Sequence, residues 1–92
     1  NYPFTKSENM SAVAHVIDFY SALKQYEKTL PYYEILINAD PNNAQWYSRL
    51  AVVYGKLGDK KKAREMVLRV LDLDPAYGSQ AQAFLAELEK QK

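Results

Sequence analysis

The chain has 92 residues, of which 48% are hydrophobic and 25% are charged, values ordinary for a soluble globular domain. The net charge of +1 gives no long-range field that would steer the chain to nucleic acid or an anionic membrane. The absence of cysteine excludes a disulfide framework and a thiolate metal site. No apolar run approaches the roughly 20 residues that a membrane span needs, so we expect no direct membrane insertion of this segment.

The first residues carry neither an initiating methionine nor a signal peptide, and we expect the chain to be a piece of a longer protein. Its compartment, cytoplasmic or periplasmic, would then depend on the parent protein. Residues 1–7 are expected to form an extended lead-in.

The first helix is predicted from about Glu8 to Lys24, and a partner helix is predicted to follow it and to end at the Asp-Pro dipeptide at residues 40–41. Apolar residues recur in both at the spacing of one helix face. They are Val13, Val16, Ile17, Tyr20 and Leu23 in the first, and Tyr26, Leu30, Tyr33, Leu36 and Ile37 in the second. Pro31 lacks an amide hydrogen and is expected to kink the second helix early in its course.

Two further helices are predicted from about Ala44 to Leu57 and from about Lys60 to Leu73. Their apolar faces carry Tyr47, Leu50, Ala51, Tyr54 and Leu57 in the third helix, and Ala63, Met66, Val67, Val70 and Leu71 in the fourth. A fifth helix, from about Ser79 to Gln91, places Ala81, Phe84, Leu85 and Leu88 on its apolar face. Its opposite face is polar, as the end of a stack of repeats requires.

Capping residues mark the ends of these helices. Asn42, followed three residues later by Gln45, is a candidate capping box at the start of the third helix. Gly58 can supply the left-handed C-terminal cap of that helix, and Asp59 can accept hydrogen bonds from the first amides of the next. The sequence therefore predicts two antiparallel helices joined by a Gly-Asp turn.

Two Asp-Pro dipeptides, at residues 40–41 and 74–75, end helices, because the residue before a proline is pushed out of the helical region. Pro41 and Pro75 are 34 residues apart. A shift by this period superposes Tyr20 on Tyr54 and Leu36 on Val70. The chain thus contains an internal repeat with the length of a helical hairpin.

The sequence resembles the tetratricopeptide repeat family, whose signature is Trp-x2-Leu-Gly-x2-Tyr, then Ala-x3-Phe, then Pro. The residues that carry the resemblance, and that are expected to form the repeat core, are Tyr20, Tyr47, Leu50, Ala51, Tyr54, Gly58, Ala63, Val67, Pro75 and Phe84. The resemblance implies an all-α helix-turn-helix repeat solenoid of about two units plus a C-terminal capping helix, five helices in all. We expect a single domain with the lead-in at 1–7, repeats at 8–41 and 42–75, and the capping helix, or half repeat, at 76–92.

In this family the first helix of each pair lines a concave groove that receives extended or helical peptides. The groove positions implied by the resemblance are Ala14, Asp18, Gln45, Ser48, Arg49, Val52, Lys56 and Gln82. One subfamily binds the C-terminal carboxylate of chaperones with lysines and asparagines on this face. Ala14, Asp18 and Arg49 stand at the corresponding places, so chaperone-tail binding is not expected.

No nucleophile–base pair is visible, and His15 is the only histidine, so we expect no enzyme activity, no cofactor and no metal site. His15 is expected at the surface, with Asp18 nearby as the only support for a metal or pH-switch role. The basic run at residues 60–64 is expected to be a solvated face, the alternative being a patch for an acidic partner or phosphate. Trp46 either packs against the preceding helix or is an exposed recognition residue.

The sequence therefore favours a non-catalytic scaffold module that binds another protein or peptide in its groove. The alternative is a C-terminal assembly appendage of a larger bacterial protein, with a weak homodimer as the interaction. This second hypothesis rests on a similarity to the repeat tails of envelope polysaccharide ligases and polymerases. Nucleic-acid binding through the basic run is not expected.

Overall fold

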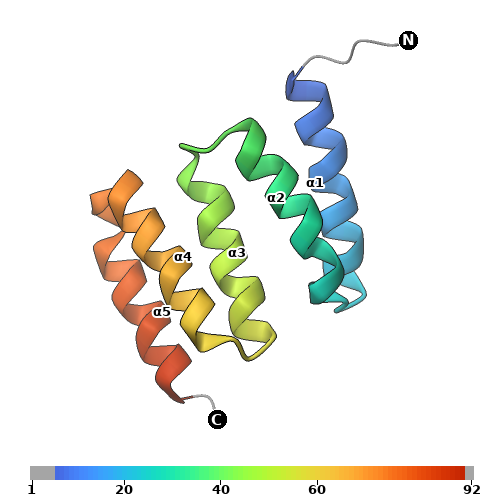
Figure 1. The fold of residues 1–92 in the computed structure, drawn as a ribbon. Coiled ribbons are helices and arrows are strands. Elements are labelled where there is room, and N and C mark those ends of the chain that lie inside the picture. Colours follow the sequence, from blue (N-terminus) through green and yellow to red (C-terminus); the bar gives the residue numbers. More distant parts are fainter. Residues whose placement is uncertain (1–5, 91–92) are drawn as a thin grey trace. The chain divides into compact units, whose positions relative to one another are not determined.

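The computed structural model describes the backbone of residues 6–90 and the side chains of residues 10–90. Within residues 6–90 it contains five α-helices and two short 3₁₀ helices, and no strand, which confirms the predicted all-α repeat fold (Figure 1). The elements are α1 (Lys6–Ala22), η1 (Tyr26–Thr29), α2 (Leu30–Ala39), α3 (Ala44–Lys56), α4 (Lys60–Leu73), η2 (Pro75–Tyr77) and α5 (Gly78–Lys90). They form two compact units, Asn1–Pro41 and Asn42–Lys92, which are described separately.

The first unit is a hairpin in which α2 runs antiparallel to α1, with η1 between them (Figure 1). Its buried side chains are Ile17, Thr29, Tyr33 and Leu36. Thr29 is the one polar member of this group, and its Oγ1 donates a hydrogen bond to the carbonyl oxygen of Tyr26, at 2.6 Å. Burial of this hydroxyl therefore leaves no unsatisfied polar group in the hairpin turn.

The first helix differs from its predicted bounds at both ends. It begins at Lys6, so residues 6 and 7 are helical where an extended lead-in was expected, and residues 1–5 lie outside the described part. It ends at Ala22 rather than Lys24. Leu23 therefore no longer follows the helical face, and its side chain is 52% exposed, in contrast to its predicted place in the core.

Pro31 does not kink a helix, as the sequence suggested, but stands in the first turn of α2. A continuous helix from Tyr26 would need the amide of residue 31 to donate to Glu27, and proline has no such hydrogen. The chain instead forms the separate 3₁₀ turn η1 and begins the α-helix again at Leu30, where a proline near the N-terminus costs no hydrogen bond.

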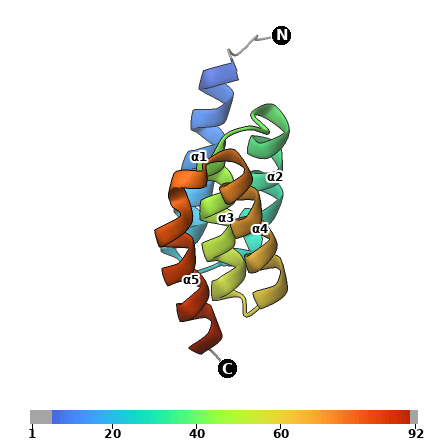
Figure 2. The same ribbon diagram turned by 90° about the vertical axis from the view of Figure 1, so that its left-hand side faces the viewer.

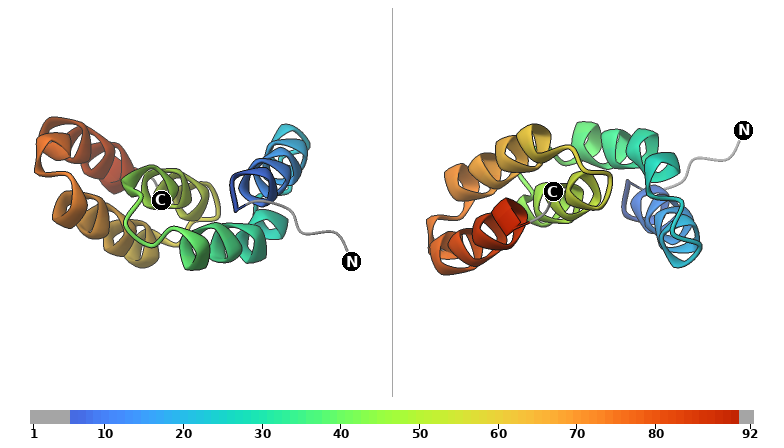
Figure 3. Two further views of the ribbon diagram at one scale, coloured as in Figure 1. Left: turned by 90° about the horizontal axis from the view of Figure 1, so that it is seen from above. Right: turned by 90° about the horizontal axis from the view of Figure 1, so that it is seen from below.

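The second unit contains three helices in two layers. α4 runs antiparallel to α3, and α5 runs in the same direction as α3 (Figures 1 and 2). Seen end-on, α3 and α5 lie in one layer and α4 in the other (Figure 3). One cluster of its core consists of Ala51, Val67 and Ala81, with Met66, Leu71, Tyr77, Phe84 and Leu85 packed against it, and the other buried apolar residues of this unit are Tyr47, Leu50, Val53, Ala63, Val70 and Leu88. Small residues in this cluster allow the three helices to approach closely.

Side chains and backbone geometry define the helix ends of this unit. Asn43, not Asn42, is the N-cap of α3, and its Oδ1 accepts from the amide of Gln45 at 3.0 Å. Gly58 has the predicted left-handed conformation, with φ of 81°. Asp59 is the N-cap of α4, where its Oδ1 accepts from the amide of Lys62 at 3.1 Å. Leu57, predicted to be inward-facing, is exposed because α3 ends one residue before it.

The fifth helix begins at Gly78, one residue earlier than predicted, and its predicted last residue, Gln91, lies outside the described part. The 3₁₀ turn η2 precedes it, and the Oδ1 of Asp74 accepts from the amide of Ala76 at 3.2 Å. Pro75, the family proline, is solvent-exposed at the start of this turn. Its contribution is thus to the backbone, where it ends α4, and not to the packed core.

Candidate functional site

The layer formed by α3 and α5 carries the candidate site. Residues on α3 that recur at intervals of three and four share one face of the helix. On this face are Ala44, Gln45, Ser48, Val52, Gly55 and Lys56. Four of the predicted groove positions, Gln45, Ser48, Val52 and Lys56, therefore lie together on one side of one helix, and two cavities open along it.

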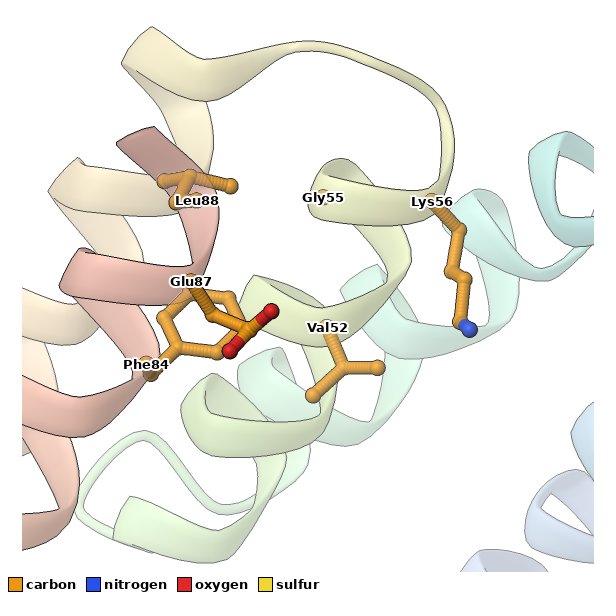
Figure 4. A pocket seen from close by; sticks show the side chains of 6 residues that line it. All are labelled: Val52, Gly55, Lys56, Phe84, Glu87 and Leu88. Carbon is orange, nitrogen blue, oxygen red and sulfur yellow. The ribbon is translucent and has the colours of Figure 1, made fainter. Parts of the chain in front are cut away.

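The first cavity lies between the C-terminal half of α3 and α5 and measures about 260 Å³. Six residues line it: Val52, Gly55 and Lys56 from α3, and Phe84, Glu87 and Leu88 from α5 (Figure 4). Because one water molecule occupies about 30 Å³ of liquid, the cavity has room for a large apolar side chain. The lining is mostly apolar: Leu88 is buried, Phe84 is half-buried, and Val52 is 45% exposed at the mouth.

Gly55 forms part of the wall of this cavity and carries no side chain into it. A Cβ atom at this position would lie 3.5 Å from Cδ1 of Leu88 and 3.6 Å from Cζ of Phe84, which is ordinary van der Waals contact. Glycine in the interior of a helix costs about 1 kcal/mol relative to alanine, so packing alone would favour the larger residue. The missing side chain leaves space between the two helices at a cost in helix stability.

Two opposite charges flank the mouth of the cavity. Lys56 on α3 and Glu87 on α5 are both exposed, and within residues 10–90 neither forms an ion pair. In Figure 4 the carboxylate of Glu87 lies beside Phe84 and Val52, whereas the side chain of Lys56 extends away from it. Both charges remain available to a ligand that enters the cavity.

The second cavity, of about 220 Å³, lies at the N-terminal half of α3 and has a different chemistry. Its lining is Ala44, Gln45, Ser48, Val70, Asp74 and Tyr77. The hydroxyl groups of Ser48 and Tyr77 are 3.2 Å apart and share one hydrogen bond. This bond joins α3 to η2, so the wall of the cavity is held in place by its own polar groups.

Arg49 lies over the indole ring of Trp46, 5.8 Å from the ring centre, and is not among the residues that line these two cavities. Such a cation–π contact holds the guanidinium beside the ring. Trp46 is half-buried, and its Nε1 is buried with no hydrogen-bond partner among the described residues. Gln82, on α5, is exposed and likewise lines neither cavity.

The remaining predicted groove residues, Ala14 and Asp18, belong to the first unit. They are four residues apart on α1 and so share a face, with Ala14 half-buried and Asp18 exposed. His15, beside them, is exposed. No group of three or more potential metal ligands occurs within the part of the chain that the structure describes.

The basic run at the start of α4 is divided among separate contacts. Nζ of Lys62 lies 5.6 Å from the ring centre of Tyr54, and Arg64 bonds the carboxylate of Glu89 at 3.2 Å. Two of its charges are thus directed to groups within the second unit, and the run does not form one uncompensated patch. Among the described helices, none is both long and apolar enough to cross a membrane.

Sequence reasoning did not select Gly55, Glu87 or Leu88 as site residues. The signal for Gly55 was present, because a glycine inside a strongly periodic helix needs a packing or functional reason. Leu88 was predicted on the apolar face of the fifth helix, and it is buried there, but the sequence did not indicate that it lines a cavity. The cavity between the helices was not, since it depends on the distance between α3 and α5.

Repeated helical hairpins, each buried against its neighbours in sequence, define an α-solenoid type of protein. A family model described as Tetratricopeptide repeat matches residues 20–88, which is well over half of the chain. The chain therefore belongs to the tetratricopeptide repeat family. Repeats of this family are generally non-catalytic modules for protein–protein interaction.

Proposed function

We propose that this chain is a non-catalytic scaffold module that binds a peptide segment of a partner protein along the α3–α5 face of its second unit. The observation that carries the proposal is the cavity of about 260 Å³ between two helices, whose lining is mostly apolar and includes an interior glycine without a side chain. Four of the five predicted groove residues on α3 line the two cavities of this face, namely Gln45, Ser48, Val52 and Lys56. Arg49 and Gln82 line neither cavity and would contribute at most at the edges of this face, whereas Ala14 and Asp18 belong to the first unit and form no part of the proposed site.

An apolar side chain of the partner would supply most of the binding free energy. Complete burial of a leucine or phenylalanine side chain is worth about 1.5–3 kcal/mol. The half-buried Phe84 and the 45% exposed Val52 provide the apolar surface for such a side chain, and the buried Leu88 lies behind them. A single anchor of this size gives modest affinity, as expected of a short recognition segment.

The test is to fill the cavity without disturbing the fold. Short peptides selected from a displayed random library on the 92-residue chain would be titrated against the wild type, Gly55→Ala and Gly55→Leu. We expect graded loss of affinity in that order, with Gly55→Ala at least as stable as the wild type in thermal melts. Leu68→Asp, at an exposed leucine of α4, is the matched surface control.

Retention of full affinity by Gly55→Leu, with its fold intact, would contradict the proposed site. If no peptide is selected under conditions in which the chain is folded, peptide recognition by this face is excluded.

A second candidate function, self-association of a larger parent protein through this segment, is favoured by two exposed apolar side chains, one in the last turn of α1 and one directly after that helix. Phe19 is 61% exposed and Leu23 is 52% exposed, and they lie four residues apart. Adjacent exposed apolar side chains are characteristic of association surfaces. Sedimentation velocity over a concentration series should then show a dimer that Phe19→Ser weakens and Leu68→Ser leaves unchanged. A monomer at all concentrations would exclude this role.

A further inference from the structure

We propose that the partner segment carries, besides its apolar anchor, a cationic side chain that enters the second cavity, between α3 and η2. This inference rests on the proposed function, because the apolar cavity must hold the same segment. It adds a second recognition element of different chemistry at a fixed distance from the first.

The lining of the second cavity is rich in acceptors. Among its six residues, Asp74 carries the only formal charge, which is negative. Its Oδ1 accepts from the amide of Ala76, and the carboxylate keeps lone pairs for further donors. The hydroxyls of Ser48 and Tyr77 use one hydrogen between them, so both oxygens can also accept from an incoming donor.

An ammonium or guanidinium group satisfies such a lining better than any other common side chain, because it has only donors and a positive charge. A carboxylate would meet Asp74 as a like charge. The first cavity has the opposite character, since Lys56 and Glu87 at its mouth balance each other and its floor is apolar. The two cavities therefore select different side chains.

The spacing of the cavities follows from their common helix. The α3 residues of one run from Ala44 to Ser48 and those of the other from Val52 to Lys56. At a rise of 1.5 Å per residue, the two centres lie about 12 Å apart along the helix axis. An extended chain advances about 3.3 Å per residue with side chains alternating between faces, so residues four apart point the same way and span this distance.

The probes are capped glycine–serine peptides with one leucine and one lysine. The leucine and the lysine are placed two or four residues apart, in either order, and one further peptide carries the leucine alone. Binding of each peptide is measured by NMR chemical-shift titration. We expect the four-residue separation, in one of its two orders, to bind about three- to tenfold more tightly than the leucine-only peptide. The two-residue separation should give no such gain.

Variants of the chain assign the gain to the cavity. Asp74→Asn keeps a side chain that can cap the amide of Ala76, and Tyr77→Phe keeps the packing of its ring. Each should remove the advantage of the lysine while the leucine-only peptide binds as before. Leu68→Ser, at an exposed leucine of α4 that lines neither cavity, should leave that advantage unchanged.

The outcomes separate this inference from the proposed function. Equal binding of the lysine-containing and leucine-only peptides by wild type and Asp74→Asn would overturn the cationic subsite and leave the apolar site standing. A lysine effect that persists in both Asp74→Asn and Tyr77→Phe would also overturn it. Failure of every leucine peptide to bind would overturn both proposals.

Discussion

The two helical hairpins of the chain make the same turn with different residues. In each, the amide of the second residue after the C-cap donates to the carbonyl five positions back, as in the Schellman motif: Gln25 to Tyr20 in the first hairpin, Asp59 to Tyr54 in the second, both at 2.9 Å. The left-handed residue is Gly58 in one hairpin, with φ of 81°, and Lys24 in the other, with φ of 61°.

The hairpins diverge directly after this turn. Asp59 caps the next helix with its side chain, and α4 begins at once with Lys60. Gln25 makes no side-chain cap, and the chain passes through η1 before α2 begins at Leu30. The first hairpin thus keeps the backbone hydrogen bond of the turn although it lacks the glycine and the capping aspartate of the second. Its left-handed residue is Lys24, whose Cβ makes that conformation strained.

The largest expected effect is on the packed face of the second hairpin. Leu50 is only 7% exposed, and Leu50→Ala should lower the free energy of unfolding by about 2–5 kcal/mol in urea melts. Val16, its counterpart in the first repeat, is half-buried, and Val16→Ala should cost less. Leu68→Ala, at a 60% exposed leucine, is the control and should stay within about 0.5 kcal/mol. If all three variants lost the same free energy of unfolding, the second hairpin would have no better-packed core than the first.

Substitutions of the two left-handed turn residues, Gly58 and Lys24, should change the free energy of unfolding in opposite directions. Gly58→Ala places a Cβ at a left-handed position and should cost about 1 kcal/mol, whereas Lys24→Gly relieves the same strain and should stabilise by up to about 1 kcal/mol. The gain is the smaller because glycine also increases the entropy of the unfolded chain. Amide hydrogen exchange would assign each change to its own hairpin. If Lys24→Gly instead lowered the free energy of unfolding, the contacts of the lysine side chain would stabilise the hairpin by more than its left-handed backbone destabilises it.

The residues at the start of the second helix of each hairpin should also differ in their effect on stability. Asp59→Ala should cost about 1 kcal/mol, because it removes the acceptor for the amide of Lys62 at the start of α4. Gln25→Ala should have almost no effect, since Gln25 makes no cap hydrogen bond. Thermal melts of the two variants, with Asp59→Asn as a substitution that retains the cap, would measure the difference. A cost for Gln25→Ala as large as that for Asp59→Ala would remove this distinction between the hairpins.

Periodicity and turn chemistry predicted the helices, because both depend on residues close together in sequence. The bounds of α4 agreed at both ends, where Asp59 caps one end and the Asp-Pro dipeptide at 74–75 stops the other. Prediction failed at Pro31, where local rules compete, and at Leu23, because α1 ends one residue before this last position of its predicted apolar face. The candidate cavities needed more than a pattern: each depends on how closely α3 approaches another element, and the sequence offers only the interior Gly55 as a sign of it.

The smallest expected effect concerns charge on the surface. Arg64 on α4 bonds Glu89 on α5 at 3.2 Å, with side chains 46% and 68% exposed. A double-mutant cycle with Arg64→Ala and Glu89→Ala should give a coupling energy of about 0.2–1 kcal/mol that falls as salt is added, because solvent and ions screen an exposed pair. If the coupling proved larger and independent of salt, α5 would be held to its hairpin by this pair rather than by the apolar contacts of Ala81 and Leu88. Substitutions at Gly55 could then change the packing of α5 on α3 as well as the binding of a ligand. The measured coupling energy therefore decides whether a loss of affinity in these variants is assigned to the cavity or to displacement of α5.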